Sequence, residues 1–97
     1  MNKEHHVIYL PGIGDHRPWA QDKIFKLWHL FGVKVDYHQI GWALNEPFEA
    51  KLKRITDKID YLTSQGFLVS LVGGSAGSSA AMNAYAKRKA KIAKIVF

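Results

Sequence analysis

The sequence contains no cysteine, so it can form neither a disulfide bond nor a thiolate metal site. It also has no run of the roughly 18–20 apolar residues that a membrane-spanning helix requires. Its polar first residues do not resemble a secretory signal peptide. The default expectation is therefore a cytoplasmic protein that has no membrane span and no metal site.

The composition of the chain is that of one folded domain, spanning residues 1–97, because 47% of the residues are hydrophobic. The formal net charge is +6, and much of it comes from Lys87, Arg88, Lys89, Lys91 and Lys94. At the end of a helix such cations complement its dipole and keep a small domain soluble. The alternative is that these cations bind a polyanion. Because the helix-end explanation is preferred, nucleic acid is not the expected partner.

Short apolar runs alternate with amphipathic stretches, which is typical of βαβ units on a parallel sheet. Strands are expected at 6–10, 33–38, 67–72 and 92–97, and helices at 18–31, 47–64 and 76–88. In the longest helix, Glu49 is expected to pair with Lys53 one turn on. The predicted fold is a three-layer αβα arrangement around a parallel sheet of about four strands, in the order 2-1-3-4.

The last predicted strand continues to Phe97 without a turn or a polar cap. An apolar strand at the edge of a sheet is a site for pairing with another strand. We therefore expect this strand to be covered by a missing C-terminal part of the same fold, or by self-association through the exposed edge.

The segment Gly73-Gly74-Ser75-Ala76-Gly77 follows the third predicted strand and precedes a helix. This is the context in which G-x-S-x-G forms a nucleophile elbow, a sharp turn that exposes the serine hydroxyl. Such a turn brings neighbouring backbone close, so its flanking residues must be small. The alternative is that these glycines only allow the helix to pack closely on the strand.

A second glycine loop, Pro11 to His16, follows the first strand. In the order 2-1-3-4, the carboxyl ends of strands 1 and 3 are neighbours and flank the point where open α/β sheets bind ligands. The loop would therefore lie beside Ser75. A dinucleotide-binding loop is disfavoured, because Arg17 stands where the third glycine of G-x-G-x-x-G belongs.

With these motifs the chain resembles the α/β-hydrolase superfamily over nearly all of its length. The resemblance implies that Ser75 is the nucleophile and that the amides of Ile13 and Ala76 form the oxyanion hole, with Gly14 as the alternative donor. It also implies hydrolysis of an ester or another acyl bond in a small-molecule substrate, through an acyl-serine and without a cofactor.

The sequence departs from that family in one respect. The family places its acid and histidine after the nucleophile, whereas all eight acids and all five histidines here precede Ser75. We therefore expect these 97 residues to be an incomplete and inactive part of a hydrolase. A non-catalytic binding or partner module of the same fold is the alternative.

Five residues are candidates for lining the substrate site: Gly14, Asp15, His16, His38 and Trp42. Asp15 could instead serve in a loop turn, and either histidine could have a loop or solvation role. Trp42 could line an acyl pocket or pack as a core aromatic.

Overall fold

The computed structural model describes residues 4–12, 32–74 and 76–96 of the chain. Its elements follow in the order β1 (His5–Leu10), β2 (Lys34–Tyr37), α2 (Phe48–Ser64), β3 (Leu68–Gly73), α3 (Gly77–Lys87), the 3-10 helix η1 (Lys89–Lys91) and β4 (Ile92–Val96). The strands and helices predicted in these segments are confirmed, with ends that agree to about one residue. The helix predicted at 18–31 lies outside the described residues.

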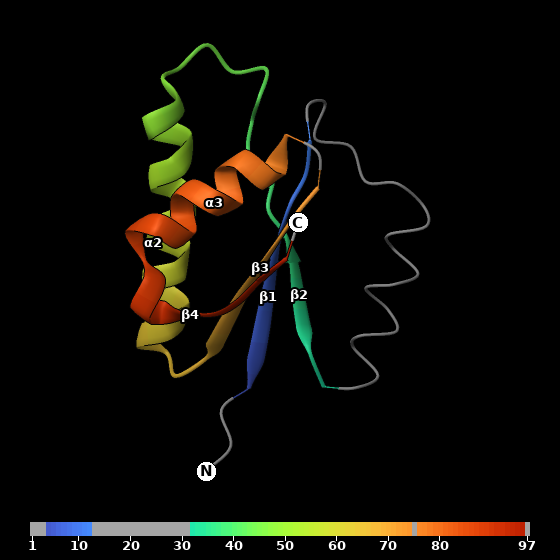
Figure 1. Ribbon diagram of the computed structural model, residues 1–97, viewed down its shortest axis with the longest axis vertical. Coiled ribbons are helices and arrows are strands. Elements are labelled where there is room, and N and C mark those ends of the chain that lie inside the picture. Colours follow the sequence, from blue (N-terminus) through green and yellow to red (C-terminus); the bar gives the residue numbers. More distant parts are fainter. Residues whose placement is uncertain (1–3, 13–31, 75, 97) are drawn as a thin grey trace.

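The four strands form one parallel sheet in the order β2-β1-β3-β4, as predicted. In this order β1 lies between β2 and β3, and Leu10 at the end of β1 pairs with Gly73 at the end of β3. The carboxyl ends of β1 and β3 therefore lie side by side (Figure 1). The loop after β1 and the turn after β3 therefore begin next to each other.

Both α2 and α3 pack on the same face of the sheet (Figure 1). The core between helices and sheet consists of buried apolar side chains: Ile8, Leu10, Ile40, Leu52, Ile55, Ile59, Leu62, Val69, Leu71, Ala80, Ala81, Ala84 and Ile92. Small alanines on α3 let this helix approach the strands closely. The layer expected on the opposite face depends on residues 18–31, so the three-layer arrangement remains a prediction.

The limits of α2 follow from its flanking residues. Pro47 occupies the N-cap with extended angles, φ −60° and ψ 148°, which suit a proline before a helix. Gly66 follows the end of the helix with φ +89°, a conformation that favours glycine. The predicted pair of Glu49 and Lys53 is wrong: Lys53 binds Asp57 at 2.8 Å, and Glu49 lies 3.6 Å from Lys87.

The basic residues after α3 are tied to α2. The Nε of Arg88 donates to Oδ1 of Asp60 at 2.8 Å, and Nζ of Lys91 lies 2.9 Å from the same oxygen. The hydrogen bond from Arg88 is the main cause that lowers the pKa of Asp60. Part of the positive charge assigned to a solvated helix end is therefore paired with a carboxylate.

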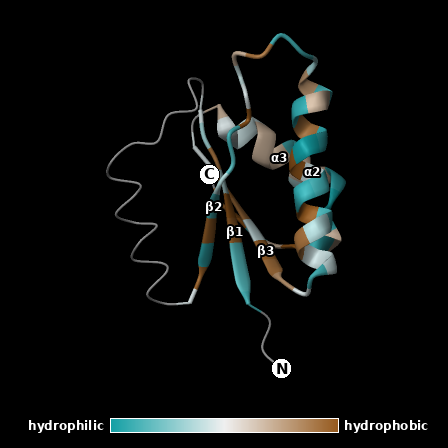
Figure 2. Cartoon of the chain, turned by 180° about the vertical axis from the view of Figure 1, so that it is seen from behind, coloured by the Kyte–Doolittle hydropathy of each residue, from teal (hydrophilic) through white to brown (hydrophobic). Residues whose placement is uncertain are grey.

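In the described part of the chain, neither helix is both long enough and apolar enough to cross a membrane. Figure 2 shows instead that the hydrophobic residues of α2 alternate with hydrophilic ones, as expected for a helix with one buried face.

Candidate active site

The connection from β3 to α3 is a tight turn. β3 ends at Gly73 and α3 begins at Gly77, so three residues join them. The N–H of Gly77 donates to the carbonyl oxygen of Gly74 at 2.8 Å, which closes a four-residue turn with Ser75 and Ala76 at its centre. The predicted strand–turn–helix context of Ser75 is present, while Ser75 itself lies outside the described residues.

Gly77 lies directly against the end of β1. A Cβ atom at this position would overlap the carbonyl oxygen of Leu10 and lie 2.6 Å from the carbonyl oxygen of Pro11. Backbone atoms cannot move aside as a flexible side chain can. Position 77 therefore accepts only glycine in this arrangement.

Gly73 is equally confined, since its Cβ would lie 2.7 Å from Cα of Ser78 and 2.8 Å from the carbonyl oxygen of Gly77. The hydroxyl of Ser78 donates to the carbonyl oxygen of Gly73 at 3.2 Å, which ties the first turn of α3 to the end of β3. These contacts explain why the glycines are there. Close packing alone would also require them, so they do not by themselves identify a nucleophile.

The turn is joined to β1 by a backbone hydrogen bond. The N–H of Gly74 donates to the carbonyl oxygen of Leu10 at 3.0 Å, one residue beyond the last pair of the two strands. The loop that starts at Pro11 and Gly12 therefore begins next to the residue that precedes Ser75. The predicted oxyanion donor Ile13 and the neighbouring candidates Gly14, Asp15 and His16 lie outside the described residues.

Tyr9 was not predicted from the sequence as a site residue. A Cβ atom on Gly74 would lie 2.5 Å from its hydroxyl oxygen, so this hydroxyl packs against the turn. Tyr9 is buried, and its ring stacks on Tyr37 at 5.4 Å between centroids. The sequence feature that could have pointed to Tyr9 is its position immediately before the Leu10-Pro11-Gly12 segment.

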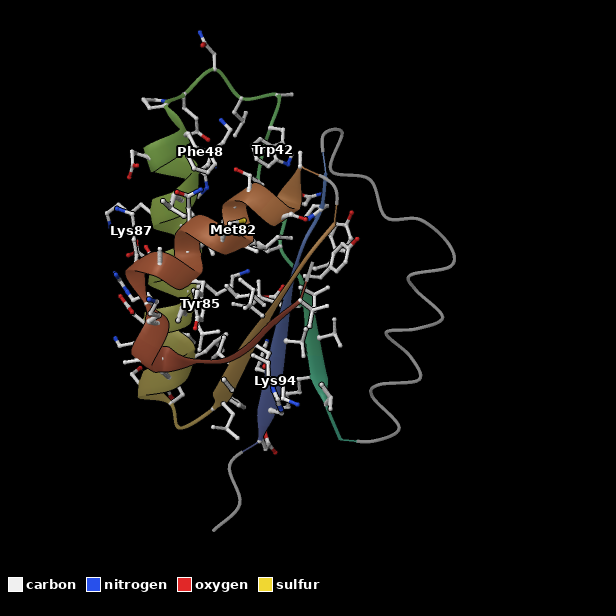
Figure 3. The ribbon with its side chains drawn as sticks, viewed as in Figure 1. Trp42, Phe48, Met82, Tyr85, Lys87 and Lys94 are labelled. Carbon is white, nitrogen blue, oxygen red and sulfur yellow. The ribbon has the colours of Figure 1, made fainter. Side chains whose placement is uncertain are left out.

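Two other predicted residues lie on the loop between β2 and α2. The Nε1 of Trp42 donates to the carbonyl oxygen of Pro11 at 3.0 Å, and its ring stacks on Phe48 with centroids 6.2 Å apart (Figure 3). His38 is buried, and its backbone N–H donates to the carbonyl oxygen of Tyr9 at 3.0 Å. Both residues thus contact the last residues of β1 or the loop that follows.

The loop after β2 is fastened to α2 by charged side chains. Glu46 accepts hydrogen bonds from Arg54 at 2.6 and 3.0 Å, and its carboxylate lies 3.3 Å from Nζ of Lys51. Lys51 is only 4% exposed and also donates to the carbonyl oxygen of Leu44. The hydrogen bond from Arg54 is the main cause that lowers the pKa of Glu46 to about 2.

The first two histidines lie at the far end of the sheet from the turn. His5 pairs with Leu68, five residues before Gly73, which corresponds to about 16 Å along the strand. Its Nε2 is 2.6 Å from the hydroxyl of Ser70, which explains the one polar residue in an otherwise apolar strand. Burial lowers the pKa of His6, whose ring packs edge-on against Phe67. Neither histidine is placed to serve Ser75.

A scan against protein-family models found no match to this chain, and a search of curated proteins found none.

Proposed function

We propose that this chain carries the nucleophile and oxyanion hole of a serine hydrolase acting on ester or other acyl bonds. The main support is the hydrogen bond from Gly74 to Leu10, which joins the turn around Ser75 to the start of the loop after β1. In this proposal the Ser75 hydroxyl attacks the acyl carbon. The amides of Ala76 and Ile13 stabilise the negative charge on the acyl oxygen, and no cofactor is involved.

The position of Ala76 suits its part in this chemistry. It is the residue before the first turn of α3, with helical angles of φ −60° and ψ −23°. The N–H groups at the start of a helix have no partner within the helix and favour an anion. A tetrahedral intermediate at Ser75 would place its oxygen near this helix end.

The base of the reaction is proposed to come from outside these 97 residues. His38 follows β2, which is separated from β3 by one strand, so it lies about 10 Å across the sheet from the turn. A general base must come within about 3 Å of the hydroxyl it deprotonates. The acid and histidine that complete the site would follow Ser75, as the resemblance to α/β-hydrolases implies.

The competing proposal is a non-catalytic module that retains the hydrolase sheet. It is favoured by one observation, namely that Gly73 and Gly77 are required by close backbone packing whether or not Ser75 is a nucleophile. Removing the base of such a site lowers the rate by about four to six orders of magnitude. We therefore expect no useful ester hydrolysis from the 97 residues by themselves under either proposal.

Covalent labelling separates the two proposals. We would treat a form of the protein that carries an acid and a histidine beyond Phe97 with a fluorophosphonate and identify the modified residue by mass spectrometry. Labelling should occur at Ser75 and should be lost in Ser75→Ala, whereas Ser79→Ala on the exposed side of α3 should label normally. A folded protein in which Ser75 stays unlabelled would favour the non-catalytic module.

A further inference from the structure

The phenol of Tyr9 lies where a side chain of residue 74 would otherwise be. An ideal Cβ on Gly74 comes within 2.5 Å of the Tyr9 hydroxyl oxygen and 3.3 Å of the ring carbon that bears it. Tyr9 is 8% exposed, and its ring is held by stacking on Tyr37, the residue paired with it across β1 and β2. Tyr9 is therefore a buried residue whose hydroxyl lies directly beside the turn.

The backbone of Gly74 does not require glycine. Positive φ angles occur at Gly32, Gly41 and Gly66 among the described glycines, and Gly74 is not one of them. Its conformation is thus open to other residues, and the reason for glycine must be space. In contrast to Gly73 and Gly77, which meet backbone atoms, Gly74 meets one side chain.

We infer that Tyr9 is a positioning residue for Ser75: its hydroxyl fills the side-chain space of Gly74 and fixes the turn from the side of β1. This inference rests on the proposed function of Ser75. The backbone bond from Gly74 to Leu10 holds the turn at one point, and the phenol supports the same residue at a second. Two supports at the residue before Ser75 limit how far the turn can shift at Gly74. A displacement of about 1 Å at a reacting group can lower a rate 100-fold.

The test is a double-mutant cycle in the protein form used for labelling Ser75. Gly74→Ala places a methyl group against the Tyr9 hydroxyl, and we expect it to lower the denaturation midpoint and slow Ser75 labelling by about 10- to 100-fold. Tyr9→Phe removes only the oxygen. The double variant Tyr9→Phe/Gly74→Ala should therefore regain the midpoint and come within a few-fold of the labelling rate of Tyr9→Phe.

Tyr37→Phe is the matched control, because it removes the same atom from the other ring of the stacked pair. It should leave the defect of Gly74→Ala unchanged. Equal rescue by Tyr37→Phe, or no rescue by Tyr9→Phe, would overturn the inference. So would a rescued midpoint with labelling rates equal to wild type in every variant, since Tyr9 would then serve folding alone.

Failure of the proposed function gives a different result. In that case wild-type protein is not labelled at Ser75, and the positioning role falls with it. The denaturation midpoints of the four proteins in the cycle would still show whether the phenol fills the space at Gly74. If wild-type protein is labelled at Ser75 and Tyr9→Phe is labelled at the same rate, Ser75 remains the proposed nucleophile. Only the positioning role of Tyr9 is then rejected.

Discussion

Two loops at the carboxyl end of the sheet are held in opposite ways. The turn after β3 is built from backbone contacts, because Gly73 and Gly77 bring main-chain atoms together without side chains. The loop after β2 is held by side chains, through the carboxylate of Glu46 and the cations of Lys51 and Arg54. The stability of the turn after β3 should therefore not depend on pH, and this turn should not tolerate substitution. The stability of the loop after β2 should depend on pH, and this loop should tolerate some substitutions.

The two loops meet at Leu10, the last residue of β1, and at Pro11, which follows it. The carbonyl oxygens of Leu10 and Pro11 lie against Gly77, and the oxygen of Pro11 also accepts the hydrogen bond from Trp42. The segment that leads into the proposed oxyanion loop is thus held from both sides. Loss of the backbone contact at Gly77 should lower the stability more than loss of the side-chain contacts of the loop after β2.

The largest effect is expected from Gly77→Ala. The added methyl group would overlap the carbonyl oxygen of Leu10, and the surrounding atoms are backbone. We expect a loss of about 3 kcal/mol or more in the free energy of unfolding, or a failure to fold. Chemical denaturation monitored by circular dichroism would measure it.

Gly66→Ala is the control for this substitution. Gly66 has φ +89° but nothing lies within 4 Å of its added Cβ, so the change introduces backbone strain without overlap. We expect it to cost about 1 kcal/mol. If Gly77→Ala proved no more damaging than Gly66→Ala, the close approach of the turn to β1 would be refuted.

Much of the fold was predictable from the sequence because it depends on local patterns. The apolar stripe of α2 and the glycine at position 66 define that helix, and its predicted range of 47–64 was confirmed to within one residue. The parallel sheet followed from the alternation of strands and helices. The strand order 2-1-3-4 does not follow from this alternation alone; it was adopted for the prediction and is confirmed. The motif around Ser75 also predicted where the turn would fall.

The contacts between distant residues were not predictable in this way. Lys51 appears in the sequence as one more charged residue on a helix, yet it is 4% exposed because the loop after β2 folds over it. The contact of Tyr9 with Gly74 depends on the register of β1 and β3 and on which face of the sheet the ring occupies. Neither is visible in a local pattern of residues.

The second effect in size is expected from Glu46→Gln. This change removes the carboxylate from Arg54 and leaves the buried ammonium of Lys51 without its counter-charge. The folded pKa of Glu46 is about 2, below the ordinary 4.5, so its stabilisation is present above pH 4.5 and is lost as pH falls toward 2. The variant should be less stable than wild type at pH 7, with the difference shrinking over this range.

Glu49→Gln is the matched control for Glu46→Gln. Its side chain is 74% exposed and lies 3.6 Å from Lys87, so its removal should change stability little at any pH. Measurements of the unfolding free energy at several pH values between 2 and 7 would compare the three proteins. A difference between wild type and Glu46→Gln that stayed constant with pH would contradict the assignment of the ion pairs.

The smallest effect is expected from Trp42→Phe, which tests the link between the two loops. Phenylalanine can keep the stacking on Phe48 but cannot donate the hydrogen bond to Pro11. A hydrogen bond of this kind contributes about 1 kcal/mol, so we expect a loss of that size. Trp42→Leu should lose more, because the stacking goes as well. Equal stability of Trp42→Phe and wild type would show that the loops are coupled by ring packing rather than by the hydrogen bond.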